Sequence, residues 1–257
     1  MADIETKKTG GTAIVTLNRP AKRNALTLAM WRDVARIFGE LGRDDTVRAI
    51  IFTGAGGNFS VGADISEFAA VREDARQSAD YEIAVDAASA AITGVPKATM
   101  AVVDGYCLGG GCHLAMACDF RFAHRTASFG IPAAKLSIVY GLASTQRLLA
   151  LVGVTQAKRI LYSGDRFDAA EATRIGFADG AGEDPMAMAH AFAATIAANA
   201  PLSVSGAKYI LNGLTAGNGA LDPAKVNALI DEAAASADYK EGRRAFAEKR
   251  PPRFQGR

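Results

Sequence analysis

The stretch Asp104-Gly105-Tyr106-Cys107-Leu108-Gly109-Gly110-Gly111-Cys112-His113-Leu114-Ala115-Met116-Ala117-Cys118-Asp119 organises this chain. An apolar run of β type, Ala98 to Val103, leads into it, and Leu114 to Ala117 read as a short buried helix. Three consecutive glycines let the backbone turn tightly and approach a ligand with no Cβ in the way. A helix that begins there aims unsatisfied N–H groups and the positive end of its dipole at the space over the glycines. The stretch predicts a site for an anion, or for an oxygen that becomes one during a reaction. A purely steric turn is the alternative.

The composition is that of an ordinary globular protein. Hydrophobic residues make up 49% and charged residues 22% of the 257 residues, which favours one large domain or a core with a small appendage. The formal net charge of +2 is too small to indicate a nucleic-acid-binding protein. The polar N-terminal stretch and the lack of a long apolar segment predict a cytoplasmic protein with no signal peptide and no membrane span.

The cysteines all lie in or beside the glycine stretch, at Cys107, Cys112 and Cys118. They form no Cys-x-x-Cys pair, and the histidines are too scattered to indicate a metal site. We therefore predict buried free thiols in a reducing compartment, which pack in the core and ligate no metal.

The first half of the chain alternates strands and helices. Ala13 to Leu17 and Val47 to Phe52 read as strands, and Thr27 caps a helix of apolar periodicity between them. Glycine turns follow the second strand and the strand at Ala98, and each opens a helix, at Ala63 and at Gly110. This order predicts an α/β fold. Two such turns brought together present two convergent N–H donors.

The middle and the C-terminal half of the chain show a different pattern. Val71 to Asp80 is predicted to be mobile and polar, with a helix after it that runs to about Ile92. From Thr145 onward the pattern is helical, and Asn199-Ala200-Pro201 marks a junction. We predict a core formed by residues 1–198 and a helical C-terminal subdomain formed by residues 199–257.

The chain resembles the crotonase superfamily, the enoyl-CoA hydratase/isomerase family, over nearly its whole length. The resemblance rests on short matches in the same order along the chain: Asn18-Arg19-Pro20, Arg23-Asn24-Ala25-Leu26, Phe59 to Ile65, Gly105 to Asp119, Phe129-Gly130-Ile131-Pro132, Thr145-Gln146-Arg147-Leu148, Gly164-Asp165-Arg166-Phe167 and Glu248-Lys249-Arg250. It implies a spiral of β-β-α turns with a helical C-terminal region that packs trimers, often paired into hexamers. It also implies an acyl-CoA thioester as the ligand, with coenzyme A as part of the substrate and no separate cofactor.

The family's oxyanion hole maps onto the backbone N–H groups of Ala63 and Gly110, which would hold the thioester oxygen as it gains negative charge in an enolate. The resemblance also places residues along the path of coenzyme A: Lys22, Arg23, Ala25, Asp64 and Ile65. For Lys22 and Arg23 the alternative is a solvated surface turn. Basic residues near the C-terminus either reach nucleotide phosphates or form a solvated helix face: Arg243, Arg244, Lys249, Arg250 and Arg253.

The chain departs from the family at two positions. In hydratases of this family two glutamates activate water and deliver a proton to carbon, and here those positions are His113 and Ala133. Hydration by the family's usual mechanism is therefore not expected. Family dehalogenases and dienoyl isomerases use an aspartate in the loop between Gly130 and Ser144, and none occurs there.

Two residues are candidates to replace the missing pair. His113 titrates near neutrality, and its place at a helix start favours the neutral form; a packed core histidine is the alternative. Tyr140 resembles the tyrosine that decarboxylases of the superfamily carry in this loop, and an aromatic wall of the acyl pocket is the alternative. Lys135 either pairs with a substrate carboxylate or is a solvated lysine.

These features predict a lyase that acts on acyl-CoA thioesters, by hydration or dehydration through a substituted mechanism or by decarboxylation. Loss of carbon dioxide needs the oxyanion hole but no strong base, so it tolerates the missing glutamates best. An acyl-CoA-binding protein without turnover is the alternative, and RNA binding has only the basic C-terminus in its favour. The region from Val71 to Ala91 is expected to shape the acyl pocket.

Overall fold

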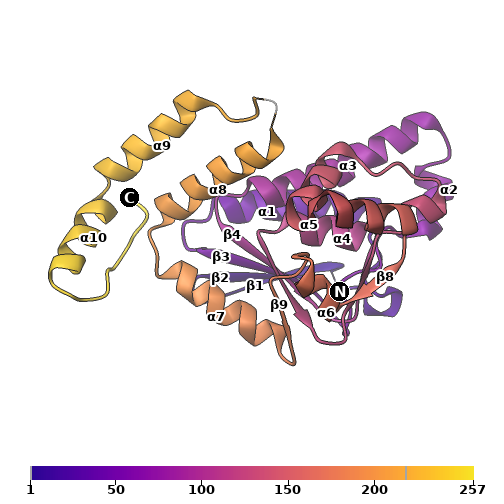
Figure 1. The fold of residues 1–257 in the computed structure, drawn as a ribbon, viewed down its shortest axis with the longest axis horizontal. Helices are drawn as coiled ribbons and strands as arrows, with labels where there is room; N and C mark the ends of the chain where they lie inside the picture. Colours follow the sequence, from indigo (N-terminus) through magenta and orange to yellow (C-terminus); the bar gives the residue numbers. More distant parts are fainter. Residues whose placement is uncertain (1, 218) are drawn as a thin grey trace.

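The computed structural model describes residues 2–217 and 219–257. Within them, a six-stranded sheet has the order β1-β2-β3-β4-β6-β9 (Figure 1). Only β1 runs antiparallel to its neighbour in this sheet, and the other pairs are parallel. The strands are β1 (Ile4–Thr9), β2 (Thr12–Leu17), β3 (Ala49–Gly54), β4 (Ala98–Val103), β6 (Phe120–His124) and β9 (Gly180–Gly182).

A smaller sheet has the order β5-β7-β8 and lies next to the turns that leave the large one. Its strands are β5 (Tyr106–Leu108), β7 (Ser128–Gly130) and β8 (Arg166–Asp168). The chain leaves β4, forms β5 and then enters α4 (Gly110–Ala117); after β6 it forms β7 in the same way. The predicted α/β fold with β-β-α turns is confirmed.

Helices cover both faces of the large sheet because its buried strands carry apolar side chains on both sides. On β3, Phe52 belongs to the larger core beneath α1 (Leu28–Gly42) and α3 (Ala75–Gly94). Ile51 points the opposite way, into a second core with Ala189 of α7 (Pro185–Ala197). Figure 1 shows α7 on the face of the sheet opposite α1 and α3. The remaining helices of the first 200 residues are α2 (Phe68–Val71), α5 (Leu142–Ser163), α6 (Ala169–Arg174) and the 3₁₀ helices η1 (Pro20–Lys22), η2 (Ile65–Glu67) and η3 (Ala133–Leu136).

Of the C-terminal helices, α8 (Pro201–Ala216) contacts β4 and α5, whereas α9 (Pro223–Ala235) and α10 (Ala237–Ala247) extend away from the sheet (Figure 1). The chain bends by 110° between α7 and α8, at the junction that Pro201 marks. An ion pair between the buried Lys208 Nζ and the partly buried Asp119 Oδ2, at 2.9 Å, ties α8 to the residue that precedes β6.

Within residues 2–217 and 219–257, no single helix is both long enough and apolar enough to cross a membrane. Helices α7 and α8 meet both conditions only when they are counted as one bent pair. The predicted thiols are confirmed: Cys107, Cys112 and Cys118 are buried and free of disulfides.

Several local predictions hold and others were wrong. The Thr27 hydroxyl accepts a hydrogen bond from Met30 N at 3.2 Å, as a helix cap should. Helix α3 already begins at Ala75, capped by the Asp74 carboxylate, so most of the segment predicted to be mobile is helical. The two helical segments expected at Gln146 to Val152 and Thr155 to Tyr162 both lie in α5, whose helical geometry is broken by a kink at Gly153, with φ 70° and ψ 168°. Strands β1 and β5 were missed because they are short or polar.

Candidate active site

The two glycine turns meet, as the family resemblance implied. A Cβ at Gly62 would lie 2.8 Å from both the Gly110 nitrogen and the Leu108 carbonyl oxygen. Only glycine allows this approach, and Gly62 also has φ at +92°. Backbone hydrogen bonds on both sides, from Leu108 N to Ser60 O and from Leu26 N to Gly62 O, hold the turns in register. The first turn of α4 is therefore fixed beside the residue that precedes Ala63.

The N–H groups of Ala63 and Gly110 are the free donors of this junction. Gly62 O and Asp64 N both bond to Leu26, so the intervening Ala63 directs its own N–H to the other side of the chain. Gly110 opens α4, where N–H groups have no acceptor within the helix. Neither N–H has a hydrogen-bond acceptor among residues 2–217 and 219–257. Two such donors suit an oxygen that carries negative charge.

His113 lies one helical turn after Gly110 and is only 5% exposed. Its Nδ1 lies 2.6 Å from the Ser144 hydroxyl in the first turn of α5. Burial lowers the pKa of His113 to about 4; the positive charge of Arg147 acts in the same direction, and the Val85 carbonyl opposes it. The imidazole is therefore neutral at pH 7, as predicted, but the main cause is burial and not the helix start on which the prediction rested. Its Nε2 atom is buried and makes no hydrogen bond of ordinary geometry in the described structure, although the Val85 carbonyl lies near enough to the ring to raise its pKa.

Tyr140 is brought to His113 by the loop between η3 and α5. The two rings meet edge to face, with centroids 6.3 Å apart. The Tyr140 hydroxyl is buried, and no hydrogen-bond partner for it occurs in the part of the chain that the structure describes. Burial raises the pKa of this phenol well above its usual range, so it keeps its proton at neutral pH. Two buried polar groups without partners, His113 Nε2 and Tyr140 Oη, indicate a place for a ligand or an ordered water.

The described carboxylates do not bond to this pair. Ala133, at one of the two positions where hydratases of the family carry glutamate, is a buried residue at the start of η3. Lys135 forms an exposed ion pair with Asp165 at 2.8 Å, so it is a surface lysine in this structure. Groups of three or more potential metal-ligating side chains were not found in residues 2–217 and 219–257.

The residues expected along the coenzyme A path lie around the end of η1 and the Ala63 turn. Lys22 and Arg23 are exposed, and Arg23 has φ at +48°. The Arg23 guanidinium lies 5.4 Å from the centre of the Tyr106 ring, and Arg166 lies 5.1 Å from the same ring. Two cations thus converge on Tyr106 of β5. A surface with this charge suits the phosphates of a nucleotide.

Three other residues of that group differ in exposure. Ile65 is 74% exposed, whereas Ala25 and Asp64 are buried. Asp64 Oδ2 accepts a hydrogen bond from Arg19 at 3.0 Å, and Asp64 Oδ1 accepts one from Ser66 N at 3.1 Å. Hydrogen bonds from Ser66 and Arg19 lower the pKa of this carboxyl. Its side chain therefore fixes the turn that carries Ala63.

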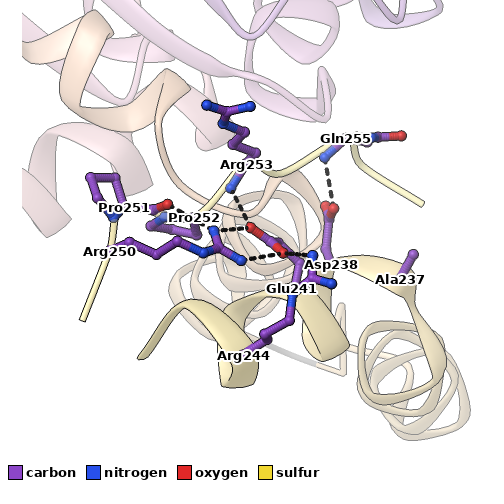
Figure 2. Close-up of a pocket in the computed structure, with 9 residues that line it drawn as sticks. All are labelled: Ala237, Asp238, Glu241, Arg244, Arg250, Pro251, Pro252, Arg253 and Gln255. Atoms are coloured by element: carbon purple, nitrogen blue, oxygen red, sulfur yellow. Dashed lines mark hydrogen bonds and ion pairs between the residues drawn. The ribbon is translucent and has the colours of Figure 1, made fainter. Parts of the chain in front are cut away.

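Two of the basic residues near the C-terminus, Arg244 and Arg250, form ion pairs with the same acidic residue. Figure 2 shows Arg244 and Arg250 converging on Glu241, each at 2.6 Å. The backbone N–H of Arg253 also donates to Glu241, at 3.1 Å. These contacts hold the C-terminal tail against α10. They favour the solvated-face interpretation of Arg244 and Arg250 over a phosphate site.

Sequence reasoning missed three residues of this site. Ser144 was assigned to a loop before a helix at Thr145, although α5 already begins at Leu142. Trp31 carries only the apolar periodicity of α1 as a signal in the sequence, yet its ring lies 6.1 Å from that of His113. No local sequence pattern indicates a hydrogen-bond partner for Tyr81, but its hydroxyl accepts a hydrogen bond from the Trp31 indole nitrogen at 2.9 Å. All three depend on contacts between residues far apart in the chain.

Comparison with known proteins agrees with this fold. Residues 7–257 match the family model described as enoyl-CoA hydratase/isomerase. A Bacillus subtilis relative that carries an enoyl-CoA hydratase/isomerase name is 36% identical over 247 residues, which cover 95% of this chain and 94% of that protein. The short-chain-enoyl-CoA hydratase of Clostridium acetobutylicum is 35% identical over 250 residues, covering 95% and 94%.

Solved structures give the same result. A crystal structure of an enoyl-CoA hydratase/isomerase family protein from Hyphomonas neptunium superposes with a TM-score of 0.94 at 36% identity, covering 100% of this chain and 98% of that one. The match extends over the core and the C-terminal helices alike. The chain therefore belongs to the enoyl-CoA hydratase/isomerase family of acyl-CoA enzymes, the crotonase superfamily.

Proposed function

We propose that this protein is a lyase that forms the enolate of an acyl-CoA thioester, holds its oxygen on the N–H groups of Ala63 and Gly110, and completes the reaction with His113 and Tyr140. The observation that carries the proposal is the coincidence of two kinds of free polar group. Two backbone donors without acceptors lie at the junction of the glycine turns, and His113, one turn along α4, is buried with an unpartnered Nε2.

Decarboxylation fits this set of groups best. In that reaction the bond from the α-carbon to a carboxylate breaks, and its electron pair passes into the enolate while carbon dioxide leaves. The α-carbon of the enolate then takes a proton. No strong base is needed at any step, and the described residues place no carboxylate on His113 or Tyr140. The neutral phenol of Tyr140 and the neutral imidazole of His113 retain protons that an enolate can take.

Hydration is less well supported. It requires a group that activates water and a group that delivers a proton to carbon, and glutamates supply both in the family's hydratases. Here the corresponding residues are His113, whose low pKa makes it a weak base, and Ala133, which has no polar side chain. A rate typical of enzymes with crotonyl-CoA, about 1–10³ per second, would contradict this reasoning.

The test is a product analysis by mass spectrometry. Purified protein is incubated with crotonyl-CoA, methylmalonyl-CoA and a longer enoyl-CoA. We expect methylmalonyl-CoA to lose carbon dioxide, with the reaction reduced about a hundredfold in His113→Gln and in Tyr140→Phe, a loss typical of general acid–base groups. Matched controls are His190→Gln and Tyr162→Phe, which change exposed residues outside this site and are expected to retain activity.

The alternative is an acyl-CoA-binding protein without turnover. It is favoured by the dense packing of rings around His113, since Trp31 and Tyr140 both contact it edge to face. Binding of all three thioesters with no product, and unchanged binding in the Tyr140→Phe variant, would support that function over catalysis.

We also propose that copies of the chain assemble as a trimer or a hexamer. The support is the run of exposed apolar side chains on the C-terminal helices: Leu211, Leu214, Ile230, Tyr239 and Phe246. Sedimentation analysis is expected to give three or six times the mass of one chain. Replacing Phe246 by Glu is expected to shift the distribution toward monomer. A monomeric wild-type protein would contradict this part of the proposal.

A further inference from the structure

The side chain of Trp31 lies against the glycine turn that carries one of the two free donors. A Cβ at Gly110 would lie 3.0 Å from Trp31 Cζ2 and 3.1 Å from Cη2, so the six-membered ring of the indole touches the Gly110 backbone. The same indole meets His113 edge to face, with centroids 6.1 Å apart. Trp31 therefore contacts both the donor that would hold the thioester oxygen and the residue proposed to act at the neighbouring carbon.

The indole is fixed in this place. It is 1% exposed, and its Nε1–H donates to the Tyr81 hydroxyl at 2.9 Å. Tyr81, on α3, is 2% exposed and packs edge to face against Phe68 at 5.9 Å. A continuous line of rings thus runs from Phe68 through Tyr81, Trp31 and His113 to Tyr140; we call it the aromatic wall. A buried indole with its N–H bonded does not swing aside without losing that hydrogen bond.

We infer that Trp31 sets the length of the acyl group that this protein accepts, and that it limits the site to short acyl chains such as acetyl, propionyl and butyryl. This inference rests on the proposed function, because it assumes that the thioester oxygen binds at Ala63 and Gly110. An acyl chain that leaves that position and passes His113 meets the indole at once. A longer chain must either displace Trp31 or leave its own methylenes in water.

The experiment measures the affinity of non-reacting saturated thioesters by isothermal titration calorimetry. Free coenzyme A, butyryl-CoA and octanoyl-CoA are titrated into the wild type and into Trp31→Ala. We expect the wild type to bind butyryl-CoA more tightly than octanoyl-CoA. Trp31→Ala is expected to reverse that order, with an octanoyl-CoA affinity at least about tenfold higher than in the wild type, because the opened space buries additional methylenes.

The matched control is Phe38→Ala, which removes another fully buried aromatic ring from the same helix. Phe38 packs on Phe52 in the core and makes no ring contact with the aromatic wall. This variant is expected to keep the wild-type preference for butyryl-CoA. If Trp31→Ala does not fold, Trp31→Leu opens part of the same space with a smaller loss of packing and carries the same expectation.

Two results overturn the inference in different ways. Wild-type affinity for octanoyl-CoA equal to or above that for butyryl-CoA, or an unchanged order of affinities in the folded Trp31 variant, contradicts the inference alone. Failure of the wild type to bind free coenzyme A or either thioester contradicts the proposed function, and the inference with it.

Discussion

The Nδ1 atom of His113 lies 2.6 Å from the hydroxyl oxygen of Ser144, in a contact that joins α4 to the first turn of α5. Ser144 is itself buried, so the hydroxyl is held as firmly as the ring. The contact fixes the plane of the imidazole and leaves Nε2 as its only free nitrogen. In the proposed reaction, Ser144 would act as a positioning residue, which orients the imidazole without contacting the substrate.

Ser144→Ala is expected to lower kcat about tenfold, with little change in KM. One hydrogen bond contributes about 1 kcal/mol, and the imidazole then loses its fixed orientation. Ser144→Thr keeps a hydroxyl at the same place and is expected to recover most of the activity. Steady-state kinetics with the thioester that is turned over provides the measurement.

Ser163→Ala, at the far end of the same helix, is the control for this change and is expected to leave kcat unaltered. Equal kcat values for the wild type and Ser144→Ala would show that the hydroxyl does not position His113.

Gly62→Ala is expected to lower kcat/KM by about 10²–10³, the loss typical of removing one donor to an oxyanion. The new Cβ would lie 2.8 Å from the Gly110 nitrogen, so the two glycine turns must move apart. Gly57→Ala is a matched comparison, because Gly57 also has positive φ, at +73°, but a Cβ there meets no atom within 4 Å.

Both variants carry the backbone strain of an alanine at positive φ, and only Gly62→Ala disturbs the pair of donors. Comparable kcat/KM losses in the two variants would therefore assign the effect to strain.

Acid is expected to destabilise the protein in part through His113. The pKa of His113 is about 4 in the folded chain and about 6.5 in an unfolded one, so the unfolded state binds more protons between these values. The free energy of unfolding should fall as the pH drops from about 6.5 to about 4, by at most about 3 kcal/mol from this group. Urea unfolding followed at several pH values measures it.

The His113→Gln variant isolates this contribution, because glutamine does not titrate and the other groups remain. The difference between the stabilities of wild type and variant should change over this pH window and stay constant above it. A constant difference down to pH 4 would mean that His113 accepts protons equally well in both states.

Arg121→Leu is expected to destabilise the fold by about 3–5 kcal/mol, because it leaves several carbonyl oxygens without their donor, and each buried acceptor left without a partner costs about 1–3 kcal/mol. The Arg121 guanidinium is buried and donates to the carbonyls of Phe177 at 2.7 Å and Cys118 at 2.8 Å, and to Asp179 at 3.1 Å. It thereby closes the C-terminal end of α4, the helix that carries Gly110 and His113. Chemical denaturation gives the free energy of unfolding.

The exposed Arg125, paired with Glu183 at 2.7 Å, provides the comparison. Arg125→Leu is expected to change stability by no more than about 1 kcal/mol, as exposed ion pairs contribute little. A similar cost for both substitutions would show that the buried guanidinium has no special role.

The sequence by itself determined the α/β class and the residue types of the site. The glycines around Gly110 require a tight turn, Thr27 caps α1, and apolar runs such as Ala98 to Val103 form buried strands, because each of these signals acts between near neighbours in the chain. The same local signals place His113 one helical turn after Gly110. They also show that Ala133 has no group able to transfer a proton.

The tertiary structure alone decided which side chains meet. Ser144 lies 31 residues from its partner His113, and Tyr81 lies 50 residues from its partner Trp31. No local pattern encodes these pairings, because they follow from how α1, α3, α4 and α5 pack on one face of the sheet. The approach of Gly62 to Gly110 likewise depends on the register of two loops held by backbone hydrogen bonds. Contacts between distant segments are set by the summed packing of the core, and only the folded chain specifies them.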